Sequence, residues 1–215
     1  MIKIPTIMEI VIIVILLSTV FIGGIIKHYN RKKGEDLLTG KRTLDSKTLI
    51  ITTRVCTILL NVIFVFIVPI LMIFDIYYLL MGWASVYFLL PTDWIFFFQI
   101  VGLVLYVLGY TIYALGRIEL GGMYSDLWEE VKIGEGIKKT GIFSKMRHPL
   151  YGGGVIFELG IVILFQTWLG LLLFIPLSII MVRQAYKEEQ WLIENYEDEY
   201  KAYMKKTWRF FPKLW

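Results

Sequence analysis

Two short polar stretches stand out in a chain that is otherwise rich in apolar and aromatic side chains. The first, KMRHPLYGGG at residues 145–154, places His148 and Tyr151 beside three consecutive glycines. The second begins with two glutamates at 188–189 and ends near Arg209. Together they offer cations, carboxylates, an imidazole and accessible backbone N–H groups, which suit the binding of a charged ligand near a membrane. These residues form the candidate site.

Each of these features also has a purely structural explanation. Pro149 disfavours helical geometry at His148, so the first stretch marks the start of a helix. The glycines that follow are typical of close helix–helix contacts in membranes. Glu188 and Glu189 are also compatible with ordinary solvated charge near a helix end. The residues alone leave both explanations open.

Several other chemistries are not indicated. The chain has two histidines, His28 and His148, and its one cysteine is Cys56. They form no cluster with metal-ligand spacing, so we expect no zinc site. One cysteine allows no internal disulfide bond. No Ser-His-Asp order supports a hydrolase.

The composition predicts a protein of the membrane. Hydrophobic residues make up 57% of the chain and charged residues 19%, whereas soluble domains carry about 25% charged residues. The net charge of +4 comes from Lys and Arg in the connections between apolar runs. That distribution is typical of cytoplasmic loops and argues against nucleic acid as a partner.

Four long apolar runs, at 6–26, 49–73, 94–116 and 154–182, define the expected spans. A shorter aromatic run at 76–90 is ambiguous, because it has fewer than the roughly 20 residues that one crossing needs. The basic loops that flank spans two and three lie on one side only if the chain crosses the membrane an even number of times between them. We therefore expect 76–90 at the outer interface, where aromatic rings prefer to lie.

The run at 154–182 is longer than the roughly 20 residues that one crossing needs. It is either one tilted span or a hairpin of two helices that turns near Gln166. The hairpin is favoured, because a single span would export the charged tail that follows. The prediction is an all-α integral membrane protein with about five transmembrane helices, the last two forming a hairpin.

The tail is expected to form a cytoplasmic amphipathic helix over 183–206. Leu192, Tyr196, Tyr200 and Tyr203 recur at helical spacing. No repeat or linker divides the chain, so we expect one domain over 1–215, with N-terminal spans in 1–93 and a catalytic core in 94–215. The active site should face the cytoplasm.

The motifs resemble those of the isoprenylcysteine carboxyl methyltransferase family of integral membrane enzymes. The stretch at 147–153, RHPLYGG, is similar to the family's R-H-P-x-Y-x-G signature, and 188–212 is similar to its E-E-x-x-L…Y-x-x-Y…R-x-x-P ending. The stretches at 120–125 and 140–143 resemble upstream family motifs. The resemblance covers 94–215, and its length and span number are like those of short archaeal members. One departure is Glu197, which stands where the family often has a glycine, so the helix is expected to continue there.

The resemblance implies S-adenosylmethionine as methyl donor and a prenylated, lipid-like acceptor with a carboxylate. It places Gly141, His148, Tyr151, Gly153 and Glu188 around the donor. We expect Arg209 to bind the acceptor carboxylate in two places, since a guanidinium matches that geometry. Glu189 would orient Arg209 or balance the sulfonium. A carboxylate is ionised at neutral pH, so positioning would supply most of the catalysis.

Three other functions stay open. A methyltransferase for a phospholipid or another amine would need a base, and a glutamate or tyrosine of the candidate site would supply it. Membrane sterol reductases have a similar R-H-P-x-Y segment and bind a reduced nicotinamide, although they are usually much longer. A non-enzymatic membrane scaffold is the third, and it would leave the clustered charges without a purpose.

Overall fold

The computed structural model describes residues 6–33, 38–39, 51–52, 55–56, 58–59, 61–74, 92–121, 132–133 and 136–212. Within these ranges the chain is almost entirely helical. The expectation that 76–90 lies at the outer interface falls outside the described residues. So do most of the basic loop that follows the first span and the greater part of 120–125.

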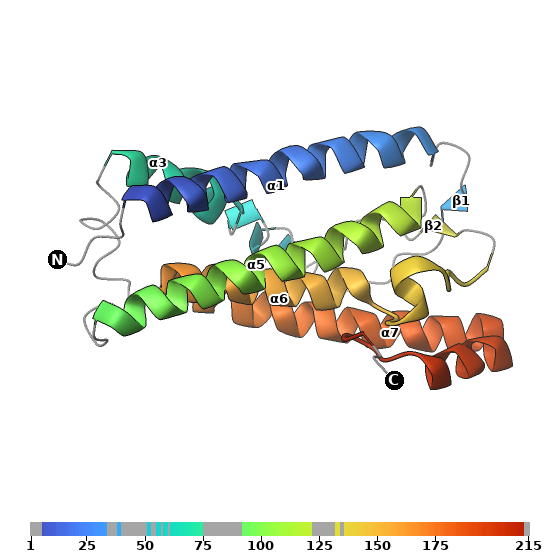
Figure 1. The fold of residues 1–215 in the computed structure, drawn as a ribbon. Coiled ribbons are helices and arrows are strands. Elements are labelled where there is room, and N and C mark those ends of the chain that lie inside the picture. The colour runs from blue at the N-terminus through green and yellow to red at the C-terminus, as the bar shows by residue number, and fades with distance from the viewer. Residues whose placement is uncertain are drawn as a thin grey trace.

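The long helices run side by side along one axis (Figure 1). They are α1, α5 and α7, with the shorter α6 between α5 and α7, and their bounds are Thr6–Lys33, Thr92–Leu120, Trp168–Lys206 and Pro149–Phe165. Three of them, α1, α5 and α7, are long and apolar enough to cross a membrane. The all-α membrane class is confirmed, whereas the number of crossings and their orientation stay predictions.

The remaining elements are short. Within the expected second span, η1 (Val62–Ile67) is a π-helix that continues into α3 (Val68–Ile73). The strands β1 (Leu38–Thr39) and β2 (Lys132–Ile133) pair in antiparallel fashion, and η5 (Gly141–Ser144) is a 3₁₀ turn before α6.

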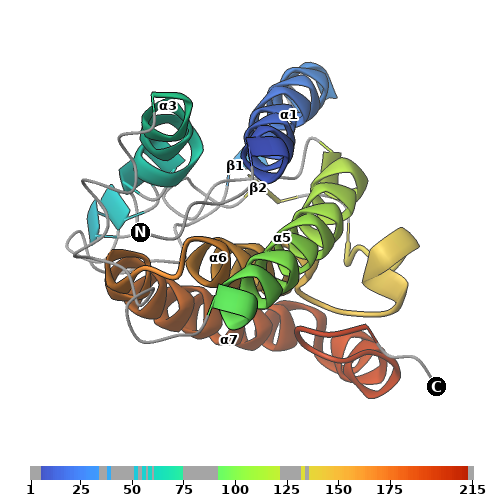
Figure 2. The ribbon, with the colours of Figure 1, turned by 60° about the vertical axis from the view of Figure 1, so that its left-hand side comes forward.

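Helices α5 and α6 pack with their backbones in direct contact, and Figure 2 shows them crossing closely. An added Cβ at Gly109 would lie 2.3 Å from the Phe157 nitrogen, and one at Gly160 would lie 2.4 Å from the Tyr106 nitrogen. Only glycine permits such an approach, which is the usual way for membrane helices to gain contact. This packing fixes α6, and with it the start of the candidate site.

The hairpin expected within 154–182 is confirmed, although its first arm, α6, begins earlier, at Pro149. The chain reverses at Gln166, whose φ of 47° and ψ of 48° are left-handed. The Gln166 side chain donates to the Ile95 carbonyl oxygen over 2.9 Å. Thr167 then caps α7 by accepting from the Leu169 N–H over 3.3 Å.

The helix expected over 183–206 is present, although it is not set apart from the hairpin. These residues continue α7 directly from the second arm of the hairpin, and the 39 residues of α7 are interrupted at one position. The expectation of an unbroken helix at Glu197 is wrong, because Glu197 has φ 34° and ψ −112°. The bend redirects the last turns of α7, and Tyr200 and Tyr203 beyond it are buried.

Replacing Glu197 with Gly should stabilise the protein. The backbone at this exposed residue lies in a region that side chains rarely adopt, and such strain costs about 1–3 kcal/mol. Glycine reaches the region freely, so we expect a higher melting temperature in detergent.

The matched control is Asp198→Gly, at the next exposed position of α7. There glycine should cost about 0.5–1 kcal/mol relative to a residue with a side chain. Equal changes in melting temperature for the two variants would show that the bend at Glu197 stores no strain.

Candidate active site

Two backbone segments lie side by side at the start of α6. Met146 and Trp208 form a parallel β-bridge. The Arg147 N–H donates to the Trp208 carbonyl oxygen over 2.8 Å, and the His148 N–H donates to that of Arg209 over 2.9 Å. The bridge brings together side chains that are about sixty positions apart in the sequence. The entropy cost of closing a loop grows only slowly with its length. The site is therefore built on main-chain geometry.

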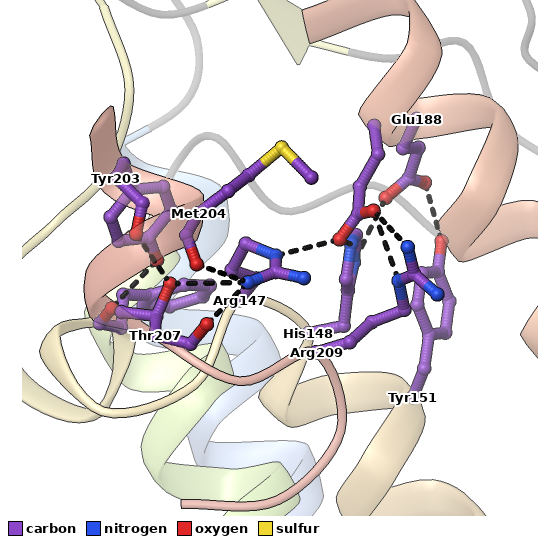
Figure 3. Close-up of polar contacts among 10 residues, drawn as sticks. Arg147, His148, Tyr151, Glu188, Tyr203, Met204, Thr207 and Arg209 are labelled. Carbon is purple, nitrogen blue, oxygen red and sulfur yellow. Dashed lines mark hydrogen bonds and ion pairs between the residues drawn. The ribbon is translucent and has the colours of Figure 1, made fainter. Parts of the chain in front are cut away.

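The Glu189 carboxylate is the centre of the cluster. Figure 3 shows Arg147, His148 and Arg209, the three side chains that contact it. The Glu189 Oε1 accepts from Arg147 Nε over 2.7 Å and lies 3.2 Å from His148 Nε2. Its Oε2 accepts from Arg209 Nε over 2.9 Å and from Arg209 Nη2 over 2.6 Å. Only 3% of the Glu189 side chain is exposed. Charge-assisted hydrogen bonds of this kind are the strong ones, so Glu189 fixes three side chains at once.

Arg147 joins this cluster to the end of α7. Its Nη1 donates to the Met204 carbonyl oxygen over 3.1 Å and also to the carbonyl oxygen of Thr207. The last carbonyls of a helix have no partner within the helix and carry its negative pole. A guanidinium satisfies both needs, which makes Arg147 a positioning residue that is buried with Glu189.

Arg209 is held on its edge and on its face. Two of its nitrogens point to Glu189, and its Cζ lies 3.8 Å from the centre of the Tyr186 ring. The hydrogen bond with Glu189 raises the pKa of Arg209 above its ordinary value, so the guanidinium stays charged. The side chain is a quarter exposed. A fixed and partly accessible cation is suited to an anionic group of a ligand.

The bidentate edge of Arg209 is therefore already occupied by Glu189. Two-point binding of an acceptor carboxylate at this edge, as expected from the sequence, would require Glu189 to move away from Arg209. Nη1 takes no part in that pair, so an anionic oxygen that met it would leave the pair intact. The structure supports a cation at this position more directly than a two-point carboxylate clamp.

Glu188 differs from Glu189 in its partners, because its carboxylate accepts hydrogen bonds from neutral groups. Its Oε1 accepts from the Tyr151 hydroxyl and from Gln184 Nε2, the latter over 3.2 Å. Its Oε2 lies 3.7 Å from His148 Nδ1, and the side chain is 27% exposed. No Lys or Arg forms an ion pair with Glu188 in the described part of the chain. Its negative charge thus remains available to a cationic ligand.

His148 connects the two glutamates. A carboxylate can only accept, so Nε2 carries the proton donated to Glu189, and Nδ1 faces Glu188. The ring stacks on Tyr151 with centroids 5.7 Å apart and lies 6.1 Å from that of Phe210. His148 immediately precedes α6, with Pro149 at the first helical position, where its missing N–H costs nothing.

The consecutive glycines of α6 face three different neighbours. An added Cβ at Gly152 would lie 2.2 Å from the Phe210 carbonyl oxygen, in the segment that carries the site's arginine. At Gly153 it would lie 2.6 Å from the Tyr113 nitrogen of α5, and at Gly154 only 3.4 Å from the side chain of Met181. The structure thus places Gly153 in a helix contact, and its expected part in donor binding stays a prediction.

Gly141 is also apart from the cluster. Its φ of 54° is left-handed, and an added Cβ would lie 2.0 Å from Glu119 Oε1. Its position at the start of η5 requires glycine for conformational reasons. Its expected role in donor binding likewise stays a prediction.

Alanine at the three glycines should affect stability very differently. Gly153→Ala pushes one helix backbone away from another, and overpacking of this kind costs about 1–3 kcal/mol. Gly152→Ala should lower the melting temperature as well, because it displaces the segment at Phe210. Gly154→Ala meets only a flexible methionine and should change the melting temperature least. A larger loss for Gly154→Ala than for Gly153→Ala would contradict this assignment.

The structure brings five of the seven expected site residues together. They are His148, Tyr151, Glu188, Glu189 and Arg209. Residue spacing did not indicate the Arg147 contact with Glu189, the stacking of Tyr186 on Arg209 or the hydrogen bond from Gln184 to Glu188. Gln184 precedes Glu188 by four residues, which on a helix is a signal for side-chain contact. Among the described residues no group of three His, Cys, Asp or Glu is placed to hold a metal ion.

One comparison with known proteins gives a match. Residues 97–199 match the family described as phospholipid methyltransferase. That family and the isoprenylcysteine carboxyl methyltransferases belong to one superfamily of membrane methyltransferases, so the expected kind of enzyme is supported but not the narrower family. The matched segment contains His148 and both glutamates and stops before Arg209. A search of curated proteins finds no match.

Proposed function

We propose that the protein is an S-adenosylmethionine-dependent methyltransferase whose acceptor is a membrane lipid or a lipid-like molecule. The observation that carries this proposal is the pairing of two different carboxylates in one cluster. Glu189 is neutralised by two arginines, whereas Glu188 beside it is held by neutral donors. One cation is thereby fixed for the acceptor and one anion is kept for the donor.

The residues present fit the donor. S-adenosylmethionine carries a sulfonium and an ammonium group, and when bound it supplies a methyl group that is already activated. Glu188 offers a carboxylate to either cation. The stacked rings of Tyr151 and His148 lie next to it, and an aromatic ring at this place suits a cation. The match to a methyltransferase family supports this assignment.

The geometry also fits an acceptor that arrives within the membrane. The cluster lies where α6 meets α7, and α7 presents exposed apolar side chains away from it, such as Leu172, Ile175 and Ile179. A lipid can therefore keep its chains in the bilayer while its polar end reaches Arg209. The chain's task is to hold acceptor and methyl group in line and in contact, which is catalysis by positioning.

Two acceptor groups are candidates, and each has its own support. The sequence motifs favour the carboxylate of a prenylcysteine, which needs no base. The family match favours a phospholipid amine. A protonated amine must lose a proton before it attacks the methyl group. Glu189 is engaged by three donors, which leaves Glu188 as the carboxylate for that step.

A methyl-transfer assay on the purified protein tests the proposal. Labelled S-adenosylmethionine is offered with a prenylcysteine, a phosphatidylethanolamine or a quinone-like lipid. We expect transfer to at least one of them. Thermal stabilisation by S-adenosylmethionine but not by NADPH would separate this function from a sterol reductase. Lack of any binding of S-adenosylmethionine would favour a scaffold and overturn the proposal.

His148→Ala and Glu188→Gln should each weaken donor binding. The first removes a stacked ring between the glutamates, and the second removes the charge that faces a cation. Loss of a hydrogen bond or contact with a charged group corresponds to about 1.5–3 kcal/mol, or about ten- to a hundredfold in affinity. Calorimetry with S-adenosylmethionine measures this, and unaltered affinity in both variants would remove the donor from this side of the cluster.

A further inference from the structure

Glu158 is a buried carboxyl group that the proposed mechanism does not use. It lies in the middle of the apolar helix α6 and is 4% exposed. Its Oε2 has no hydrogen-bond partner, and no Lys or Arg pairs with it, within the part of the chain that the structure describes. A carboxylate without a cation is very costly in an apolar setting, whereas a protonated carboxyl group has an O–H to donate. Ionisable residues inside membrane helices usually serve a function.

The position of Glu158 on α6 relates it to the candidate site. Glu158 follows Tyr151 by seven residues and precedes Val162 by four. At this spacing the three side chains share one face of the helix. Tyr151 contacts Glu188 of α7, and Val162 Cγ2 lies 3.1 Å from where a Cβ at Gly170 of α7 would be. Glu158 lies between these two contacts and therefore faces α7. It is deeper than Tyr151 by about 10 Å, the rise of seven helical residues.

The contact between α6 and α7 is made by side chains at this level. On the same stretch, an added Cβ at Gly154 would meet only Met181 Sδ and Cε, each at 3.4 Å. The opposite side of α6 is different, because there backbone meets the backbone of α5. Methionine is flexible and adapts to irregular partners. A lipid chain that entered at this level would displace the buried side chain of Met181 and no backbone contact at Gly154.

We propose that the Glu158 carboxyl group donates a hydrogen bond to an ester carbonyl of the acceptor, which is then a diacyl glycerolipid. This rests on the proposed function, because the head group of that lipid would lie at Glu188 and Arg209. In an extended glycerophospholipid the ester groups lie below the end of the head group by a length comparable with two helical turns. A prenylcysteine has no ester at that depth, so Glu158 would select between the two acceptor classes.

The test compares two lipids that differ only in the proposed contact. Purified full-length protein in detergent is titrated with dioleoyl phosphatidylethanolamine and with its diether analogue, which has the same head group and chains but no carbonyl. The shift in melting temperature gives the affinity for each. We expect the diester to bind about five- to tenfold more tightly, as one buried hydrogen bond implies. Labelled-methyl transfer to each lipid is measured in parallel.

Two variants identify the residue responsible. Glu158→Leu should abolish the preference for the diester, whereas Glu158→Gln should keep it because an amide N–H still donates. Without lipid, Glu158→Leu should melt no lower than the parent protein, because it removes an unpartnered polar group. If Glu158 only stabilised the fold, Glu158→Leu would instead melt at a lower temperature than the parent protein.

The outcomes separate the two proposals. Equal affinity of the parent protein for the two lipids, or a preference that survives Glu158→Leu, would overturn the role of Glu158 while methyl transfer could still stand. A diester preference that depends on Glu158, in a protein that transfers no methyl group to any lipid, would support the ester contact and overturn the proposed function.

Discussion

Glu189→Gln should be among the most damaging single substitutions in this protein. The variant keeps the shape of the side chain but leaves Arg147 and Arg209 without their shared counter-charge. Removing one partner of a buried ion pair costs about 3–5 kcal/mol, because the other charge stays buried. Methyl transfer should fall by about a hundredfold as Arg209 loses its orientation. Thermal unfolding in detergent and the labelled-methyl assay measure the two effects.

Glu188→Gln is the matched control, one residue away. Its partners are the Tyr151 hydroxyl and the Gln184 amide, which an amide oxygen can still accept from. Its melting temperature should therefore change little. The double variant Arg147→Met with Glu189→Leu should lose less stability than the sum of the single ones, since no buried charge between that pair remains. Equal stability of Glu188→Gln and Glu189→Gln would refute the central place of Glu189.

Arg209→Ala should abolish most of the methyl transfer while largely preserving donor binding. The guanidinium is the partly exposed cation of the cluster and lies outside the contacts of Glu188. Removing one preorganised group that stabilises charge in an active site costs about 10²–10³ in turnover. Because Glu189 keeps Arg147 and His148 as partners, the stability loss should be smaller than for Glu189→Gln.

Arg209→Lys separates charge from geometry. Lysine keeps the positive charge but cannot offer two parallel donors to Glu189 or stack on Tyr186 in the same way. We expect partial activity at most. Calorimetry with S-adenosylmethionine accompanies the kinetics, because the donor should bind both variants. Unchanged turnover in Arg209→Ala would exclude Arg209 from the site.

Hydropathy predicted most of the fold, for a physical reason. In lipid the backbone must satisfy its own hydrogen bonds, so long apolar runs become helices. The hairpin that turns at Gln166 followed from the charged tail beyond it, which a single span would have exported. The bend at Glu197 was not predicted, because glutamate favours helix where the related family often has glycine, although Tyr200 and Tyr203 beyond the bend are buried.

The site was predictable where adjacent residues carry a motif, as at His148 and Glu188. It was not predictable where partners come from distant segments. Arg147 satisfies the carbonyls of Met204 and Thr207, a demand that arises only once α7 ends beside it. Tyr186 stacks on Arg209 only because the β-bridge at Trp208 aims that side chain. Such contacts depend on tertiary geometry that residue spacing does not encode.

The guanidinium of Arg147 contacts both the Glu189 carboxylate and the final turn of α7, so a change at the carboxylate should be measurable at that turn. Amide hydrogens near residues 204–207 exchange with solvent water only when that turn opens. A ligand that strengthens the contact between Arg147 and Glu189 should slow the deuterium uptake of these amides, although it contacts none of them. Hydrogen–deuterium exchange at this turn would therefore report occupancy from a distance, without a label on the lipid.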